Sequence, residues 1–75
     1  MDTQKRIERI KWLIDNGVPV YDENIGYRCI KDNIGQYLVV FTGNDYCIGL
    51  FGYNDTTLNA TNPFFFNENG EKINL

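Results

Sequence analysis

Residues 37–51 read YLVVFTGNDYCIGLF, two apolar runs joined by a short Gly-Asn turn. A two-residue loop of this composition favours a β-hairpin with a primed turn, which fixes how the two strands pair. Both runs are apolar at nearly every position instead of every second one, so both faces of the hairpin need cover. We expect that cover to come from sheet curvature, a second copy of the chain or another protein. The predicted cross-strand pairs are Thr42–Asp45, Phe41–Tyr46, Val39–Ile48, Tyr37–Leu50, Leu38–Gly49 and Val40–Cys47.

Residues 3–16 have the period of an amphipathic helix. Asp2 is a plausible N-cap, and Asn16-Gly17 followed by Pro19 is a strong stop signal. Trp12, the one tryptophan of the chain, falls on the side opposite the core-facing stripe, so periodicity does not place it in the core. The stripe spans about 120°, as one buried helix face requires, and consists of Thr3, Ile7, Ile10, Leu13 and Ile14.

The remaining residues favour short strands separated by turns. Residues 18–21 are predicted to form an edge strand, because Pro19 cannot donate a hydrogen bond to a neighbouring strand. Turn residues at 22–26 precede two strands, and residues 52–62 are polar and turn-rich, typical of an exposed loop. The two strands that follow the turn are predicted at residues 27–31 and 36–42.

Two further turns set the expected registers. A four-residue loop at Asp32–Gly35 would place Cys29 opposite Leu38, on the same face of the sheet as Cys47. A two-residue turn at Asn69-Gly70 would form a second hairpin. This turn would pair Phe66 with Ile73 and Phe64 with Leu75, and Phe65 would face the other way, beside Asn74.

These patterns predict an α+β fold, with one N-terminal amphipathic helix packed on a four- or five-stranded antiparallel meander sheet. The length of 75 residues fits a single domain, residues 1–75, with the helix at about 3–16 and the β-meander at about 18–75. The alternative is a small curled β-barrel with a flanking helix, which would cover its own concave face.

Charge and hydropathy limit the partners. The net charge is −3, and it is divided unevenly: residues 1–16 carry four basic and three acidic side chains, and residues 17–75 carry three and seven. An acidic sheet argues against a nucleic-acid partner, which needs a basic surface. No apolar stretch approaches the roughly 20 residues that span a bilayer, so we expect no membrane association and a cytoplasmic location.

Residue usage is biased toward asparagine and isoleucine. The chain has ten asparagines, eight isoleucines and one alanine, a bias that resembles AT-rich coding sequence. Such composition is found in many low-GC bacteria and their phages. It favours, by analogy alone, a small phage or mobile-element accessory protein.

The chain lacks the residues on which most catalytic sites depend. It contains no histidine and no serine, which removes serine nucleophiles, the usual base for a catalytic cysteine and the commonest metal ligand. Cys29 and Cys47 are predicted on strands separated by a third strand, about 9.6 Å apart by strand spacing, whereas a disulfide needs Cα atoms within about 7 Å. We therefore expect free thiols, and two thiols without histidine make a poor zinc site. We therefore expect no enzymatic activity, no cofactor and no metal.

Protein binding is the favoured function. An exposed tryptophan flanked by Lys5 and Arg9 would be a strong contact site, because Trp, Tyr and Arg dominate interface hot spots. Trp12, Lys5, Arg9 and Phe65 are the predicted partner-binding residues, for a protein of unknown identity or for a homodimer. The module would inhibit or modulate its partner by occluding a surface.

Two other classes of function stay open. Sheet aromatics can stack nucleotide bases, which makes Arg28, Lys31 and Tyr37 the candidate residues of a single-stranded nucleic-acid binder. A small enzyme that uses a cysteine or paired carboxylates is the third hypothesis. Acidic pairs such as Asp22-Glu23 fall in predicted turns, where solvated charge is the commoner explanation.

Overall fold

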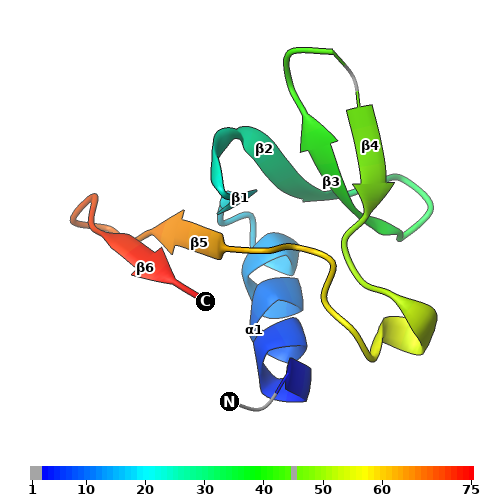
Figure 1. The fold of residues 1–75 in the computed structure, drawn as a ribbon. Helices are drawn as coiled ribbons and strands as arrows, with labels where there is room; N and C mark the ends of the chain where they lie inside the picture. Colours follow the sequence, from blue (N-terminus) through cyan, green and yellow to red (C-terminus); the bar gives the residue numbers. More distant parts are fainter. Residues whose placement is uncertain (1–2, 45) are drawn as a thin grey trace.

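The computed structural model describes residues 3–44 and 46–75, with the backbone alone at Tyr53 (Figure 1). Within these residues, six strands form one open antiparallel sheet in the order β4 (Tyr46–Gly49), β3 (Tyr37–Phe41), β2 (Asn24–Lys31), β1 (Val20–Asp22), β5 (Pro63–Phe66) and β6 (Lys72–Asn74). The α+β prediction is confirmed, with six strands instead of four or five, and the sheet does not close into a barrel. The elements are α1 (Thr3–Asp15), β1 (Val20–Asp22), β2 (Asn24–Lys31), β3 (Tyr37–Phe41), β4 (Tyr46–Gly49), a 3-10 turn (Tyr53–Asp55), β5 (Pro63–Phe66) and β6 (Lys72–Asn74).

Helix α1 follows its predicted stripe closely. Ile7, Ile10 and Leu13 are buried, while Thr3 at the first turn is exposed. The helix ends in a Schellman motif, in which Gly17 has a φ of 79° and Val18 N–H donates to the Leu13 carbonyl at 2.9 Å. The expected N-cap, Asp2, lies outside the described residues.

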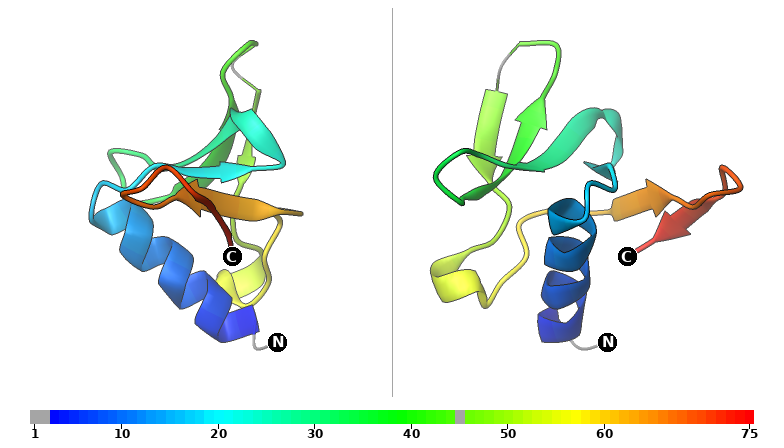
Figure 2. Two further views of the ribbon diagram at one scale, coloured as in Figure 1. Left: turned by 90° about the vertical axis from the view of Figure 1, so that its left-hand side faces the viewer. Right: turned by 180° about the vertical axis from the view of Figure 1, so that it is seen from behind.

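Strand β1 is central, which corrects the expectation of an edge strand. Val20 pairs with Cys29 of β2 on one side and with Phe65 of β5 on the other. Pro19 lies just before the strand, so its missing N–H removes no ladder hydrogen bond. After β4 the chain returns through residues 50–62 and adds β5 beside β1 (Figures 1 and 2).

The β3–β4 register agrees with the sequence. Phe41 lies opposite Tyr46 and Val39 opposite Ile48, as the Gly-Asn turn predicts, and Leu50 N–H donates to the Tyr37 carbonyl at 3.0 Å. The expected pairing of Thr42 with Asp45 falls on a residue outside the described part of the chain.

The β2–β3 register is one residue away from the predicted one. Asp32 N–H donates to the Gln36 carbonyl, so Lys31 lies opposite Tyr37 and Cys29 opposite Val39. The prediction that the two cysteines share a face is therefore wrong: Cys29 faces the helix and is buried, whereas Cys47 is exposed. Both are free thiols, as expected.

The β5–β6 register shows the same offset. Asn67 N–H donates to the Glu71 carbonyl, so Phe65 pairs with Ile73 and Phe66 with Lys72. The expected pairs Phe66–Ile73 and Phe64–Leu75 are wrong, and Phe65 faces the helix side of the sheet. A three-residue loop closed by Gly70, at a φ of 79°, replaces the predicted two-residue turn.

One row of apolar side chains crosses all six strands beneath α1. Each member lies directly opposite the next on the neighbouring strand, and the row consists of Ile48, Val39, Cys29, Val20, Phe65 and Ile73. Val20 at its centre has no exposed surface, and Cys29 and Val39 are 3% exposed. The core consists of the middle of this row, the buried face of α1, and Leu50 and Ala60 from the segment after β4.

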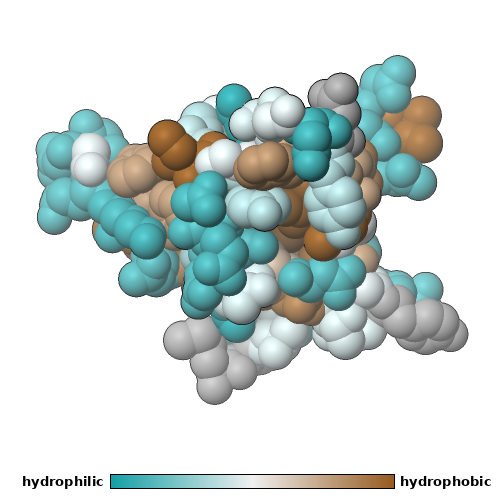
Figure 3. Space-filling view, turned by 45° about the horizontal axis from the view of Figure 1, so that its top comes forward, coloured by the Kyte–Doolittle hydropathy of each residue, from teal (hydrophilic) through white to brown (hydrophobic). Residues whose placement is uncertain are grey.

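The reverse face of the sheet is only partly covered. Phe64 is buried there by its neighbours Tyr21 and Phe66, whose ring centroids lie 5.5 and 5.6 Å away. Toward β4 the cover ends, with Leu38 and Val40 half-buried and Cys47 exposed. On the side drawn in Figure 3, apolar side chains are exposed in separate patches between polar ones.

Candidate functional site

A shallow groove runs between the C-terminal half of α1 and the β5–β6 hairpin. Its volume is about 490 Å³, and its lining is mostly apolar. We call it the aromatic groove; its lining residues are Arg9, Trp12, Leu13, Val18, Phe65, Phe66, Asn67 and Glu68. The helix and the hairpin come from opposite ends of the chain, and Figure 1 shows the hairpin extending past the upper part of α1.

Trp12 is the most exposed aromatic side chain at the groove. It is 61% exposed, because it lies on the helix face opposite Ile10 and the sheet. Phe65 is half-buried and packs against the core. The next residue, Phe66, points to the other face of the strand and is 41% exposed. The hairpin therefore presents one aromatic ring to the core and the next to solvent.

Arg9 and Glu68 bring opposite charges to the two walls of the groove. The Arg9 guanidinium lies 5.8 Å from the centre of the Phe65 ring, a cation–π contact. Glu68 is exposed in the β5–β6 turn. The ion pairs among residues 3–44 and 46–75 are Lys11–Asp55 and Lys31–Asp15, so neither charge of the groove has an ionic partner within the described chain.

The structure brings together three of the four predicted partner-binding residues. Trp12, Arg9 and Phe65 line one groove, whereas Lys5 is exposed on the same helix but is not among the lining residues. Sequence reasoning missed Phe66 and Glu68. Their positions depend on the register of the β5–β6 turn, which the Asn-Gly signal alone sets incorrectly.

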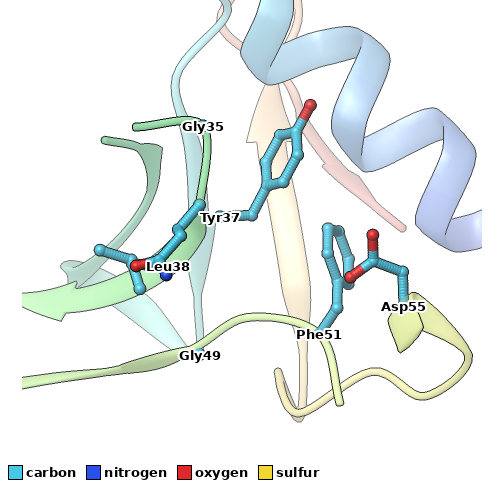
Figure 4. Close-up of a pocket in the computed structure, with 7 residues that line it drawn as sticks. Gly35, Tyr37, Leu38, Gly49, Phe51 and Asp55 are labelled. Carbon is cyan, nitrogen blue, oxygen red and sulfur yellow. The ribbon is translucent and has the colours of Figure 1, made fainter. Parts of the chain in front are cut away.

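A second cavity of about 500 Å³ lies at the start of β3. Figure 4 shows Tyr37, Phe51 and Asp55, which line it from β3, the segment after β4 and the 3-10 turn. Lys11 of α1 binds Asp55 at 2.7 Å, and its ammonium lies 5.5 Å from the centre of the Tyr37 ring and 5.4 Å from that of Phe51. These contacts hold the 50–62 segment against the helix.

Tyr37 also anchors the C-terminal end of α1. Its hydroxyl donates to Asp15 at 2.8 Å, and this hydrogen bond, with a smaller effect from Lys31, lowers the pKa of the Asp15 carboxyl below its ordinary 3.8. The hydrogen bond to Asp15 raises the pKa of Lys31. Burial, followed by the hydrogen bond to Asp15, raises the pKa of the Tyr37 phenol.

The three candidate nucleic-acid residues do not form one surface. Tyr37 and Lys31 lie directly opposite each other on the helix side of the sheet, whereas Arg28 is one residue out of phase and lies on the reverse face. The Lys31 ammonium already lies over the Tyr37 ring at 5.3 Å, with the carboxylate of Asp15 beside it. A base stacked on this ring would displace Lys31 and face a carboxylate.

The buried thiol is not an activated nucleophile. Burial raises the pKa of Cys29 to about 12, and the nearby Asp22 carboxylate adds to the shift, so the thiol is protonated near neutral pH. Asp22 has a structural role: its side chain accepts a hydrogen bond from the Asn62 N–H at 2.8 Å. This contact ties the returning 50–62 segment to β1.

The described residues contain no cluster of three or more Cys, Asp or Glu side chains that could hold a metal ion. The one α-helix found in them is also too short and too polar to cross a membrane. Comparisons of the chain with protein-family models, curated proteins and solved structures found no match.

Proposed function

We propose that this chain is a non-enzymatic protein-binding module and that the aromatic groove is its binding surface. The observation that carries the proposal is Trp12, which is 61% exposed at the mouth of an apolar groove. Burial of one tryptophan in an interface contributes several times more than an average contact, and such anchors are enriched in Trp and Arg.

The surroundings of Trp12 favour binding over a purely structural role. The buried stripe of α1 already holds the helix on the sheet, so the indole is not required for packing. Arg9, one turn earlier, keeps its guanidinium at the groove by its contact with Phe65. The groove therefore combines an aromatic anchor, an apolar floor and a charge held ready for a partner.

We propose that the module inhibits or modulates its partner by covering a surface of it. With no catalytic group required, occlusion is a mode of action that a small domain can perform alone. An accessory role in a phage or mobile element, and a cytoplasmic site of action, belong to this proposal; the two free thiols are typical of a reducing compartment.

The test is affinity capture with immobilised wild type, Trp12→Ala and Tyr46→Ala. Tyr46 is a matched control, because it is 55% exposed on β4, at the far edge of the sheet from the groove. A protein retained by wild type and by Tyr46→Ala, but not by Trp12→Ala, is the expected result. With that protein purified, Trp12→Ala should weaken binding by at least about 2 kcal/mol, roughly thirtyfold in Kd.

The folding control is a denaturation curve. Trp12→Ala should change the free energy of unfolding by no more than about 0.5 kcal/mol, as for an exposed side chain, whereas Ile10→Ala should cost about 2–5 kcal/mol. Equal binding of a partner by wild type and by folded Trp12→Ala would refute the groove as the binding surface.

A further inference from the structure

The charges and the apolar lining of the aromatic groove indicate what kind of partner would fit it. Resting on the proposal that this groove is a protein-binding surface, we infer that a second copy of the chain binds there, groove against groove, about a two-fold axis. In this arrangement Arg9 of each copy pairs with Glu68 of the other. The dimer covers the same residues that would contact another protein.

The first support is charge complementarity. The groove carries one cation on its helix wall, Arg9, and one anion on its hairpin wall, Glu68, and neither has an ionic partner within the described chain. A two-fold axis across the groove places the helix wall of one copy against the hairpin wall of the other. Both charges are then paired at once, whereas an unrelated partner would have to supply a matching cation and anion at the same spacing.

The second support is the arrangement of apolar surface around those charges. The floor of the groove is formed by Leu13, Val18 and Phe65, and Trp12 stands exposed on one wall. In a two-fold contact each copy supplies both a projecting indole and an apolar floor to receive one. A self-complementary patch of this kind, with an aromatic core and charges beside it, is the usual anatomy of a homodimer contact.

Self-association would then regulate the module. Because dimer and heterologous complex use the same side chains, a copy engaged in the dimer cannot present Trp12 to another protein. The apparent affinity for a partner should therefore weaken as the concentration of the module rises above the dimer dissociation constant, because only the monomer presents the groove.

Charge reversal tests the inference directly. Sedimentation equilibrium over a range of concentrations is run for wild type, Arg9→Glu, Glu68→Arg and the double variant. Each single reversal sets like charges against each other at both pairs and should raise the dimer Kd at least about tenfold. The double variant restores opposite charges and should return the Kd to within about threefold of wild type, as expected when Arg9 of one copy contacts Glu68 of the other.

The controls change the same charge outside the groove. Lys5→Glu alters α1 one turn before Arg9, and Glu71→Arg alters the end of the β5–β6 turn, three residues after Glu68. Both residues are exposed and neither lines the groove, so both variants should dimerise as wild type does. Far-UV circular dichroism checks that every variant keeps the native fold.

Two outcomes would overturn the inference: wild type that stays monomeric up to millimolar concentration, or a double variant no better than the single reversals. Either result leaves the proposed function standing if a partner is still captured in a Trp12-dependent way. If the dimer follows the charge-reversal pattern but no other protein is captured in a Trp12-dependent way, the inference stands and the proposed function fails. The groove would then bind only a second copy of the chain.

Discussion

Gly35 and Gly70 close two turns of the same design. Each occupies the fourth position of a five-residue segment that starts with Asp32 or Asn67, and each has a positive φ, 90° and 79°. The Asp32 side chain accepts from the N–H groups of residues 34 and 36, and the Asn67 side chain accepts from those of residues 69 and 71. The shared motif is a three-residue loop with a left-handed glycine.

A substitution at Gly35 tests this turn. Alanine there meets no atom within 4 Å, so its cost is the backbone strain of a left-handed residue, about 1–2 kcal/mol of the free energy of unfolding. Gly35→Asn should cost less, because asparagine tolerates this conformation. Gly49→Ala is the control: its φ is not positive, and the added carbon would lie at an ordinary 3.5 Å from the nearest atom. Urea denaturation ranks the three variants.

At the scale of elements, the sequence predicts what depends on local period and composition. The apolar stripe and the Gly17 stop signal lie within α1 or directly after it, and they predict the helix and its end. The Gly-Asn turn lies between β3 and β4 and predicts how these two strands pair. The other two registers are shifted because the loop length predicted for each turn is wrong. The sequence suggests a four-residue loop at Asp32–Gly35 and a two-residue turn at Asn69-Gly70, whereas the side-chain hydrogen bonds of Asp32 and Asn67 close a three-residue loop in each case. One residue of shift places Cys29 on the face opposite to the predicted one, and it gives Phe65 the partner Ile73 in place of Asn74.

The position of β1 depends on long-range pairing. Val20 and Phe65 are directly opposed although 45 positions separate their numbers, and nothing local to either strand signals the contact. The same limit applies to the aromatic groove. The helical wheel predicts the positions of Trp12 and Arg9, but the hairpin that faces them is positioned by the long-range β1–β5 pairing.

The contact between α1 and β3 gives a pH-dependent prediction. Tyr37 lowers the pKa of Asp15 in the folded chain, so folding favours the ionised carboxylate; the resulting stability is present above the ordinary pKa of 3.8 and is lost as pH falls through the lowered value. Tyr37→Phe removes the main cause. Its free energy of unfolding should therefore decrease less than that of wild type between about pH 5 and pH 2.

Urea midpoints measured across that range for wild type, Tyr37→Phe and Tyr46→Phe check this. The Tyr46 variant removes a hydroxyl from an exposed residue of β4 and should follow the wild-type profile. Parallel profiles for wild type and Tyr37→Phe would show that the Tyr37 hydroxyl does not perturb Asp15.

Across the molecule, the two faces of the sheet differ in the residues that they carry. The row beneath α1 is apolar on all six strands, whereas the corresponding row on the reverse face includes Arg28, Tyr21 and Asn74. The apolar β3–β4 hairpin is thus covered on one face by α1 together with the returning 50–62 segment, and only partly on the other. Its two apolar faces therefore do not become two packed layers, and the aromatic groove lies at the opposite end of the sheet.

The alkylation rate of Cys29 measures whether the core beneath α1 stays packed. Cys29 sits in the apolar row on β2, 3% exposed, and burial raises its pKa to about 12, so both access and ionisation oppose alkylation in the native state. In a Cys47→Ala variant it is the single thiol, and its reaction with iodoacetamide should require global unfolding. The labelling rate should rise with urea in parallel with the unfolded fraction.

The complementary variant, Cys29→Ala, leaves the exposed Cys47, which should react in native buffer at close to the rate of a small model thiol. Fast labelling of Cys29 in native buffer, at a rate independent of urea, would mean that the helix leaves the sheet without unfolding of the rest. Solvent would then reach the apolar row beneath α1 in the native state, because α1 would not cover it permanently. The two faces of the sheet would differ in solvent protection much less than the strand pairing implies.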